Sequence, residues 1–144
     1  MEYKLFINDL PQEAIDIRYQ VFTLEQGFAK EVDLDDFDNK SIHILVYVDE
    51  LPIATARMFK ESNNSYHIGR IAVLKEYRNK GVGSFILSVF EKKAKELGAS
   101  TINIGSQIDK AGFYKKCGYI KHGDIFYDAG YPHIMMKKEL KSFK

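Results

Sequence analysis

Residues 78–84, Arg-Asn-Lys-Gly-Val-Gly-Ser, combine two basic side chains with two glycines in one short stretch. Because glycine has no side chain, the backbone N–H groups around Gly81 and Gly83 can approach a bulky anion closely. Arg78 and Lys80 add positive charge at the same place. If a helix begins here, its unpaired N–H groups and its dipole also favour negative charge. The stretch is therefore predicted to bind a phosphate or pyrophosphate group.

Two widespread phosphate-binding motifs do not fit this stretch. The P-loop pattern G-x-x-x-x-G-K-[ST] is absent, and the pattern G-x-G-x-x-G would require glycine where Ile86 stands. The pattern [RQ]-x-x-G-x-[GA] does fit, through Arg78, Gly81 and Gly83. So short a pattern has little specificity alone, and a tight strand-to-helix turn with exposed basic residues is the structural alternative.

The elements that would position this turn follow from apolar periodicity and from turn residues. The pattern predicts strands over 2–7, 42–48, 52–60, 66–74, 100–104, 119–127 and 132–138, and helices over 11–26, 81–97 and 109–116. Helix 81–97 has its apolar residues, including Leu97, on one face, and Gly98 follows it as a stop. The order β-α-β-β-β-α-β-α-β-β predicts an α/β fold with helices packed on a sheet.

The motif and its surroundings resemble the GCN5-related N-acetyltransferase (GNAT) superfamily. The motif follows a strand that ends Ile71-Ala72-Val73, and a segment at 111–119, Ala-Gly-Phe-Tyr-Lys-Lys-Cys-Gly-Tyr, comes later in the chain. Further stretches resemble the ElaA-like subgroup: 18–27, 33–38, 54–58, 68–73 and 129–136. The resemblance implies one N-acetyltransferase domain over residues 1–144, with a mixed, mostly antiparallel sheet of about seven strands, flanking helices and a splayed strand pair for CoA.

The resemblance also implies acetyl-CoA as cosubstrate and direct transfer of its acetyl group to an amine. The backbones of Ile71, Ala72 and Val73 would pair with the pantetheine arm, and Gln107 would make a polar contact with it. The pyrophosphate would lie on the segment composed of Arg78, Asn79, Lys80, Gly81, Val82, Gly83 and Ser84.

Tyr114 and His67 are the residues expected to move protons. The family counterpart of Tyr114 protonates the leaving thiolate, and a phenol is protonated at neutral pH; the alternative is an aromatic core residue beside Phe113. His67 stands where the histone-acetylating branch has a carboxylate, and an imidazole could accept the proton of the amine, directly or through water. Glu25, His43, His133 and Asp128 are further candidates for the base, each with a structural role as its alternative.

An acidic loop is predicted over residues 31–38, and Arg57 and Arg70 interrupt apolar strands. The loop is interpreted either as a solvated loop or as a rim that attracts an amine. The two arginines are interpreted as ion-pair partners of this loop, with binding of a substrate carboxylate as the alternative. The spacing of the loop does not fit a calcium-binding loop, and no metal is expected.

Charge and composition limit the classes of partner that this chain is expected to bind. The formal net charge is +1, which argues against nucleic acid as a partner, and the chain has a single cysteine, Cys117. No apolar run approaches a membrane span, and no signal-peptide core is present at the N-terminus, so a cytoplasmic protein without a membrane partner is expected. Phe and Tyr residues in the last strands are compatible with a homodimer.

Three functions therefore remain open at the level of sequence. The first is an acetyltransferase acting on an amine, favoured for a small molecule because little of the chain lies outside the core elements. The second is a CoA-binding regulatory module without turnover. The third is a protein or peptide N-acetyltransferase.

Overall fold

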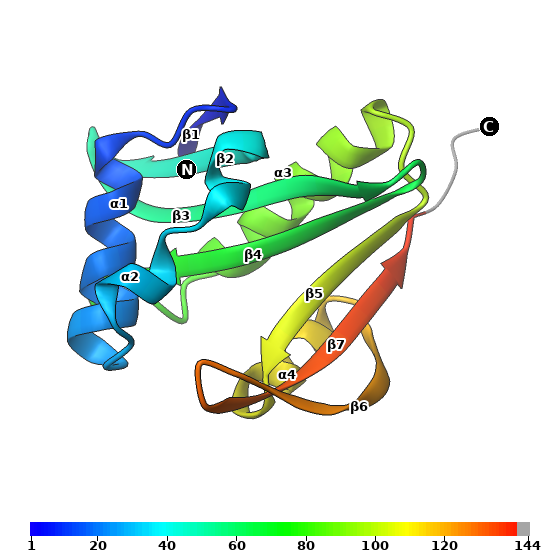
Figure 1. Ribbon diagram of the computed structural model, residues 1–144. Coiled ribbons are helices and arrows are strands. Elements are labelled where there is room, and N and C mark those ends of the chain that lie inside the picture. The colour runs from blue at the N-terminus through cyan, green and yellow to red at the C-terminus, as the bar shows by residue number, and fades with distance from the viewer. Residues whose placement is uncertain (141–144) are drawn as a thin grey trace. The chain divides into compact units, whose positions relative to one another are not determined.

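The sheet of this computed structural model, which describes residues 1–140 apart from the side chains of residues 31 and 32, has seven strands. Their order is β1-β2-β3-β4-β5-β7-β6 (Figure 1). The β4–β5 pair is parallel, whereas β1–β2, β2–β3, β5–β7 and β6–β7 are antiparallel. The strands are β1 (Glu2–Ile7), β2 (Ile42–Val48), β3 (Leu51–Ser62), β4 (Ser65–Val73), β5 (Thr101–Gln107), β6 (Ile120–Asp128) and β7 (Tyr131–Glu139).

Contacts divide the chain into two compact units. The first comprises Met1–Phe59 and Gly69–Ser88, and the second comprises Lys60–Ile68 and the chain from Val89 onward. Strand β4 and helix α3 (Val82–Glu96) pass from one unit into the other. The expectation of a single domain over residues 1–144 stays a prediction.

In the first unit, the segment predicted as one helix over 11–26 forms two helices of different pitch. Helix α1 (Gln12–Arg18) is followed by η1 (Tyr19–Glu25), a π-helix in which the Gln26 N–H donates to the Val21 carbonyl. The apolar face holds both helices in place: Ala14, Ile17 and Val21 pack with Leu45 and Ala72.

The acidic stretch is more ordered than the predicted loop. Residues Lys30–Asp33 form helix α2, and Asp36–Lys40 form the 3₁₀ helix η2. The carboxylate of Asp35 accepts a hydrogen bond from the Phe37 N–H and caps η2. The expectation of a loop over 31–38 is therefore wrong for its backbone.

The hairpin predicted between the second and third strands is confirmed. Asp49 and Glu50 have φ of 50° and 68°, which suits a two-residue turn whose twist matches that of the strands. Strand β3 continues to Ser62, beyond the predicted end at residue 60.

Helix α3 begins and ends within one residue of the predicted 81–97. Its buried residues are Val82, Ile86, Leu87, Phe90 and Ala94. Leu97 was expected on the apolar face, but it lies after the last helical turn and is 46% exposed.

The second unit adds β5, η4 (Ile108–Lys110), α4 (Ala111–Lys116), β6 and β7. Strand β5 extends to Gln107, past the predicted end at 104, because Ile102, Ile104 and Ser106 alternate into the interior. None of the helices in the described part of the chain has the length and apolar character needed to cross a membrane.

Candidate active site

The glycine turn lies in the first unit between β4 and α3. After β4 ends at Val73, the 3₁₀ helix η3 (Lys75–Tyr77) leads into the turn. Asn79 and Gly81 have φ of 62° and 82°, in the left-handed region. A Cβ at Gly81 would meet no atom within 4 Å. The backbone conformation therefore calls for glycine at this position, and the space beside it is open.

The first N–H groups of helix α3, which follows directly after Gly81, have no acceptor within the helix. The Phe85 N–H donates to the Gly81 carbonyl at 3.0 Å, which is the first hydrogen bond of the helix. The N–H groups of Val82, Gly83 and Ser84 precede this bond and have no acceptor within the helix. With the positive end of the dipole of a 15-residue helix and exposed Lys80, these donors form a site suited to an anion.

Arg78 is held in place by the protein itself. Its Nε donates to the Val73 carbonyl at 2.8 Å, and its Nη1 and Nη2 donate to the two carboxylate oxygens of Glu25 at 2.9 and 2.6 Å. Three of the five N–H groups of the guanidinium are thus engaged. Its expected contact with pyrophosphate stays a prediction.

The backbone of β4 has an unusual conformation just before Ile71–Val73, the residues expected to pair with pantetheine. Arg70, in β4, has φ of 51°, which is rare for a residue with a side chain and costs free energy. Ala72 is fully buried in the core of the first unit, whereas Ile71 and Val73 are half-buried. The side chain of Ala72 thus packs inward, and the pairing of these three backbones with pantetheine stays a prediction.

Buried ion pairs hold α1 against the acidic segment. Arg18 is 1% exposed; its Nε lies 3.1 Å from Asp33 Oδ2 and its Nη1 lies 2.8 Å from Asp38 Oδ1. Burial opposes ionisation of Asp38, but Arg18, with help from the Asp35 N–H and Arg57, holds the pKa of its carboxyl at about 2. The His43 Nε2 meets the Asp38 carbonyl at 2.9 Å, and burial lowers the pKa of this imidazole.

Arg57 and Arg70 join the same network, which confirms their interpretation as ion-pair partners. Arg57 binds Asp35 at 2.6 Å and Asp38 at 3.0 Å, and Arg70 lies 3.2 Å from Asp35 and 3.4 Å from an oxygen of Asp33. Asp33, Asp35 and Asp38 are therefore paired with arginine, which weakens the alternative of an amine-attracting rim.

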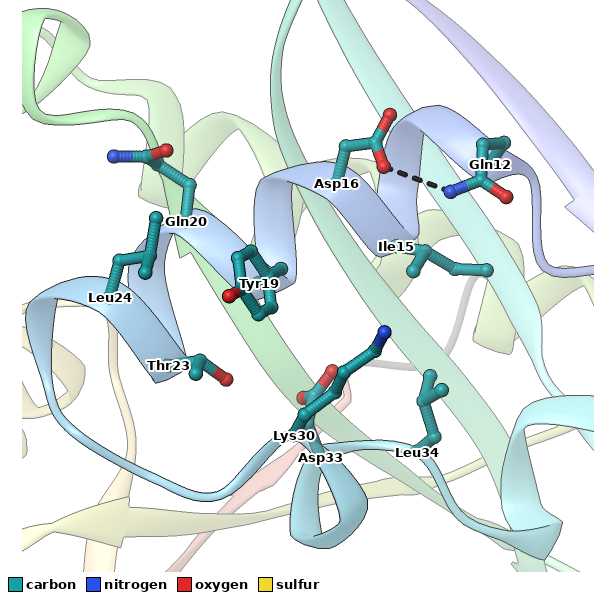
Figure 2. A pocket seen from close by; sticks show the side chains of 10 residues that line it. All are labelled: Gln12, Ile15, Asp16, Tyr19, Gln20, Thr23, Leu24, Lys30, Asp33 and Leu34. Atoms are coloured by element: carbon teal, nitrogen blue, oxygen red, sulfur yellow. Dashed lines mark hydrogen bonds between the residues drawn. The ribbon is translucent and has the colours of Figure 1, made fainter.

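A groove of about 380 Å³ lies between α1, η1 and α2 (Figure 2). The Thr23 Oγ1 lines it, is shielded from solvent and has no hydrogen-bond partner among residues 1–140. The Lys30 ammonium lies 5.9 Å from the centre of the Tyr19 ring at the same groove. The lining residues are Gln12, Ile15, Asp16, Tyr19, Gln20, Thr23, Leu24, Lys30, Asp33 and Leu34. Sequence reasoning missed this groove because it expected a loop where α2 forms one wall.

Tyr114 lies in helix α4 of the second unit and is 9% exposed. Its ring meets Phe113 at 5.1 Å and Tyr119 at 6.2 Å, edge to face in both cases. Burial raises the pKa of the Tyr114 phenol, so the group stays protonated at neutral pH. The surroundings fit both a packed aromatic residue and a proton donor.

His67 also lies in the second unit, beside a carboxylate that sequence reasoning missed. His67 Nδ1 is 3.4 Å from Glu61 Oε2, and the Asn103 amide donates to Glu61 Oε1 at 2.9 Å. The interaction with His67 holds the pKa of Glu61 below its ordinary value, and Asn103 adds to this effect. Pairing of β4 with β5, which places His67 opposite Asn103, is the signal that could have revealed this cluster of His67, Glu61 and Asn103.

Gln107, the residue expected to contact pantetheine, ends β5, where its register partner is His133.

The other candidate bases have structural surroundings. His43 is 1% exposed within the Arg–Asp network, and His133 packs on Phe126 while its Nδ1 contacts the Tyr131 carbonyl at 2.7 Å. Asp128 is exposed at the end of β6, and Glu25 pairs with Arg78. Among residues 1–140, no cluster of three or more His, Cys, Asp or Glu is arranged to hold a metal ion.

Comparison with known proteins gives matches along nearly the whole chain. Residues 7–140 match the acetyltransferase (GNAT) domain family. An uncharacterized N-acetyltransferase of Bacillus subtilis, YjcF, is 37% identical over 129 residues, which are 89% of this chain and 91% of that protein. The crystal structure of Escherichia coli ElaA superposes with a TM-score of 0.83 at 25% identity, covering 96% of this chain and 99% of ElaA.

A more distant structure shows the same fold with a ligand. A GNAT family acetyltransferase from Elizabethkingia anophelis, solved with acetyl-CoA bound, has a TM-score of 0.73 at 18% identity, covering 96% of this chain and 97% of its own. Together these matches confirm the predicted resemblance, including the relation to ElaA, and the mixed sheet with flanking helices.

Proposed function

Because this chain belongs to the acetyltransferase (GNAT) family and is therefore an acyltransferase, we propose that it transfers the acetyl group of acetyl-CoA directly to the amine of a small molecule. The observation that carries the proposal is the turn at Gly81, where open space meets the free N–H groups of α3. In this proposal, residues 78–84 bind the pyrophosphate of CoA.

The pantetheine arm would pair with the backbone of Ile71–Val73, with a polar contact from Gln107. The strand pair that would splay to admit it is β4 and β5. Register pairing between them runs from Ser65 with Thr101 to Ile68 with Ile104, before Ile71 is reached. Such placement holds the thioester in an orientation that lowers the barrier to attack.

Proton transfer would divide between two residues. As the amine nitrogen attacks the thioester carbon, the carbon–sulfur bond breaks and the sulfur leaves as a thiolate. Tyr114 donates its phenolic proton to that sulfur, which its burial supports by keeping the phenol protonated. His67, beside Glu61, accepts the proton that the amine releases, directly or through water.

The groove between α1, η1 and α2 supports a small acceptor. Its volume of about 380 Å³ lies in the range of small-molecule sites. Its lining mixes apolar side chains such as Ile15 and Leu24 with polar ones, among them the unpartnered hydroxyl of Thr23 (Figure 2). A hydroxyl in that position can accept a hydrogen bond from an ammonium or amine group.

An amine screen tests this function. The chain is incubated with acetyl-CoA and a panel of small amines, amino acids and short peptides, and release of free CoA thiol is followed. We expect release with at least one small amine, and acetylation of that amine by mass spectrometry. Turnover only with peptides would favour a peptide N-acetyltransferase, and CoA binding without any turnover would favour a regulatory module.

A further inference from the structure

The ion pair between Glu25 and Arg78 joins two segments that lie 53 residues apart in the sequence. It has the parallel, two-bond geometry of the strongest carboxylate–guanidinium contacts, with distances of 2.9 and 2.6 Å. Both side chains lie near the surface, at 30% and 37% exposure. Two parallel hydrogen bonds fix the orientation of the guanidinium as well as its distance from the carboxylate, so this pair can position Arg78.

Glu25, one partner of this pair, belongs to η1, a helix that lines the groove. Glu25 is the last residue of η1, the π-helix, and its neighbour Leu24 lines the groove (Figure 2). Wide helical turns of this kind occur often at functional sites. The helix ends directly after Glu25: Gly27 has φ of 81°, and the Phe28 N–H donates to the Phe22 carbonyl at 2.9 Å across the helix end.

The other end belongs to the cofactor turn. Arg78 is the first residue of the motif, and its Nε holds the carbonyl of Val73, the last residue of β4. One guanidinium thus fixes the end of the strand, the start of the turn and the end of η1 relative to one another.

We infer that Glu25 is a positioning residue for acetyl-CoA: it orients Arg78 and so fixes the start of the pyrophosphate-binding turn. The inference rests on the proposed function.

The direction in which the Kd for acetyl-CoA changes distinguishes a positioning role of Glu25 from a purely electrostatic effect of its charge. Replacing Glu25 with glutamine removes a negative charge next to a site for an anion. Coulomb attraction alone then predicts tighter binding of acetyl-CoA. If Glu25 positions Arg78, loss of the ion pair predicts weaker binding of acetyl-CoA. Arg78 and the turn would then be ordered only when the cofactor binds, and this ordering costs binding free energy.

The experiment is calorimetric titration of wild type, Glu25→Gln and Glu76→Gln with acetyl-CoA at fixed low salt. Glu76 is an exposed residue of η3, two positions before Arg78, and makes the same change of charge. We expect Glu25→Gln to raise the Kd at least about threefold, and Glu76→Gln to leave it unchanged or slightly lower. An unchanged or lower Kd for Glu25→Gln would overturn the inference.

A double-mutant cycle completes the test. With Arg78→Gln there is no guanidinium for Glu25 to orient, so positioning predicts that adding Glu25→Gln to Arg78→Gln leaves the Kd for acetyl-CoA unchanged or slightly lower. An increase in Kd as large as the one that Glu25→Gln causes in the wild-type chain would overturn the inference. If wild type binds no acetyl-CoA, the proposed function itself fails, which is a separate outcome.

Discussion

At the scale of single residues, Gly81 has the most specific role. Its φ of 82° excludes most side chains on conformational grounds, while the space next to it is empty. The need for a left-handed backbone at Gly81 and the need for open space beside it can therefore be tested separately, because asparagine tolerates the left-handed region and valine does not.

We predict that Gly81→Asn keeps its thermal stability but loses acetyl-CoA affinity by about tenfold or more, equivalent to about 1.4 kcal/mol. Its added side chain would occupy the place of the pyrophosphate. Gly81→Val should in addition lose about 1–2 kcal/mol of unfolding free energy, from backbone strain. Thermal unfolding and calorimetry measure both quantities. Wild-type affinity in folded Gly81→Asn would show that the turn does not bind the cofactor.

Tyr114 allows the second residue-scale prediction. Tyr114→Phe keeps the ring contacts with Phe113 and Tyr119 and removes only the proton donor. We expect kcat to fall by about a hundredfold, and the Kd for acetyl-CoA to change less than about threefold, because the hydrogen bond strengthens only as the thiolate leaves. Steady-state kinetics with the best amine gives kcat. An unchanged kcat would leave Tyr114 a packing residue.

At the scale of elements, buried ion pairs hold α1 against the acidic segment. Arg18, on α1, reaches Asp33 at the end of α2 and Asp38 in η2, and the latter also binds Arg57 on β3. The network keeps one wall of the groove beside the other, since Asp33 itself lines the groove.

Arg18→Met should lower the free energy of unfolding by about 3–5 kcal/mol, because two buried carboxylates lose their main partner. Urea unfolding measures the change. A matched control is Lys4→Met in β1, which removes an exposed charge of the same sign and should cost less than about 0.5 kcal/mol. A loss below about 1 kcal/mol for Arg18→Met would contradict a structural role for the network.

Elements with regular periodicity were predictable, and the irregular ones were not. Helix α3 and the β2–β3 hairpin follow from the apolar stripe and the Asp49-Glu50 turn. The sequence pattern does not reveal the change from α1 to the π-helix at Tyr19. The two kinds of helix differ by less than one residue per turn, and a segment of this length is too short to distinguish them. Helix α2 and η2 were missed because contacts with distant elements hold them in place: arginines bind Asp38 and Asp35, and Phe37 stacks on Phe59 at 4.5 Å.

At the scale of the whole molecule, the titrating groups of the network make stability depend on pH. The folded pKa values of Asp38, about 2, and Asp35 lie below the ordinary 3.8, so their contribution is complete above that value and is lost as pH falls toward 2. The folded pKa of His43 is lowered from 6.5, so the unfolded chain takes up a proton first as pH falls below 6.5.

We therefore predict a thermal midpoint that is highest near neutral pH, declines below about pH 6.5 and declines more steeply below about pH 4. Thermal unfolding from pH 8 to pH 3 checks this. Asp38→Asn should have a shallower decline in the lower range than wild type, because its carboxylate contribution is already absent. A midpoint that rises on acidification would contradict the assignment of these carboxylates to ion pairs.

The candidate site could be proposed from sequence only where its residues are close together in the chain. The glycines and basic residues of 78–84 suggested the turn, and the family segment around Tyr114 suggested that residue; their roles stay predictions. Glu25 with Arg78, and Glu61 with His67, are contacts between distant segments that depend on the fold and not on spacing along the chain.

The measurement that tests the central claim most directly is calorimetric titration of the wild-type chain with acetyl-CoA, free CoA and ATP. If residues 78–84 bind the pyrophosphate and β4 receives the pantetheine arm, both CoA forms should bind one to one with a Kd on the order of micromolar, and ATP should bind far more weakly. Absence of binding by either CoA form would contradict the account, because the glycines would then serve only to turn the chain into α3.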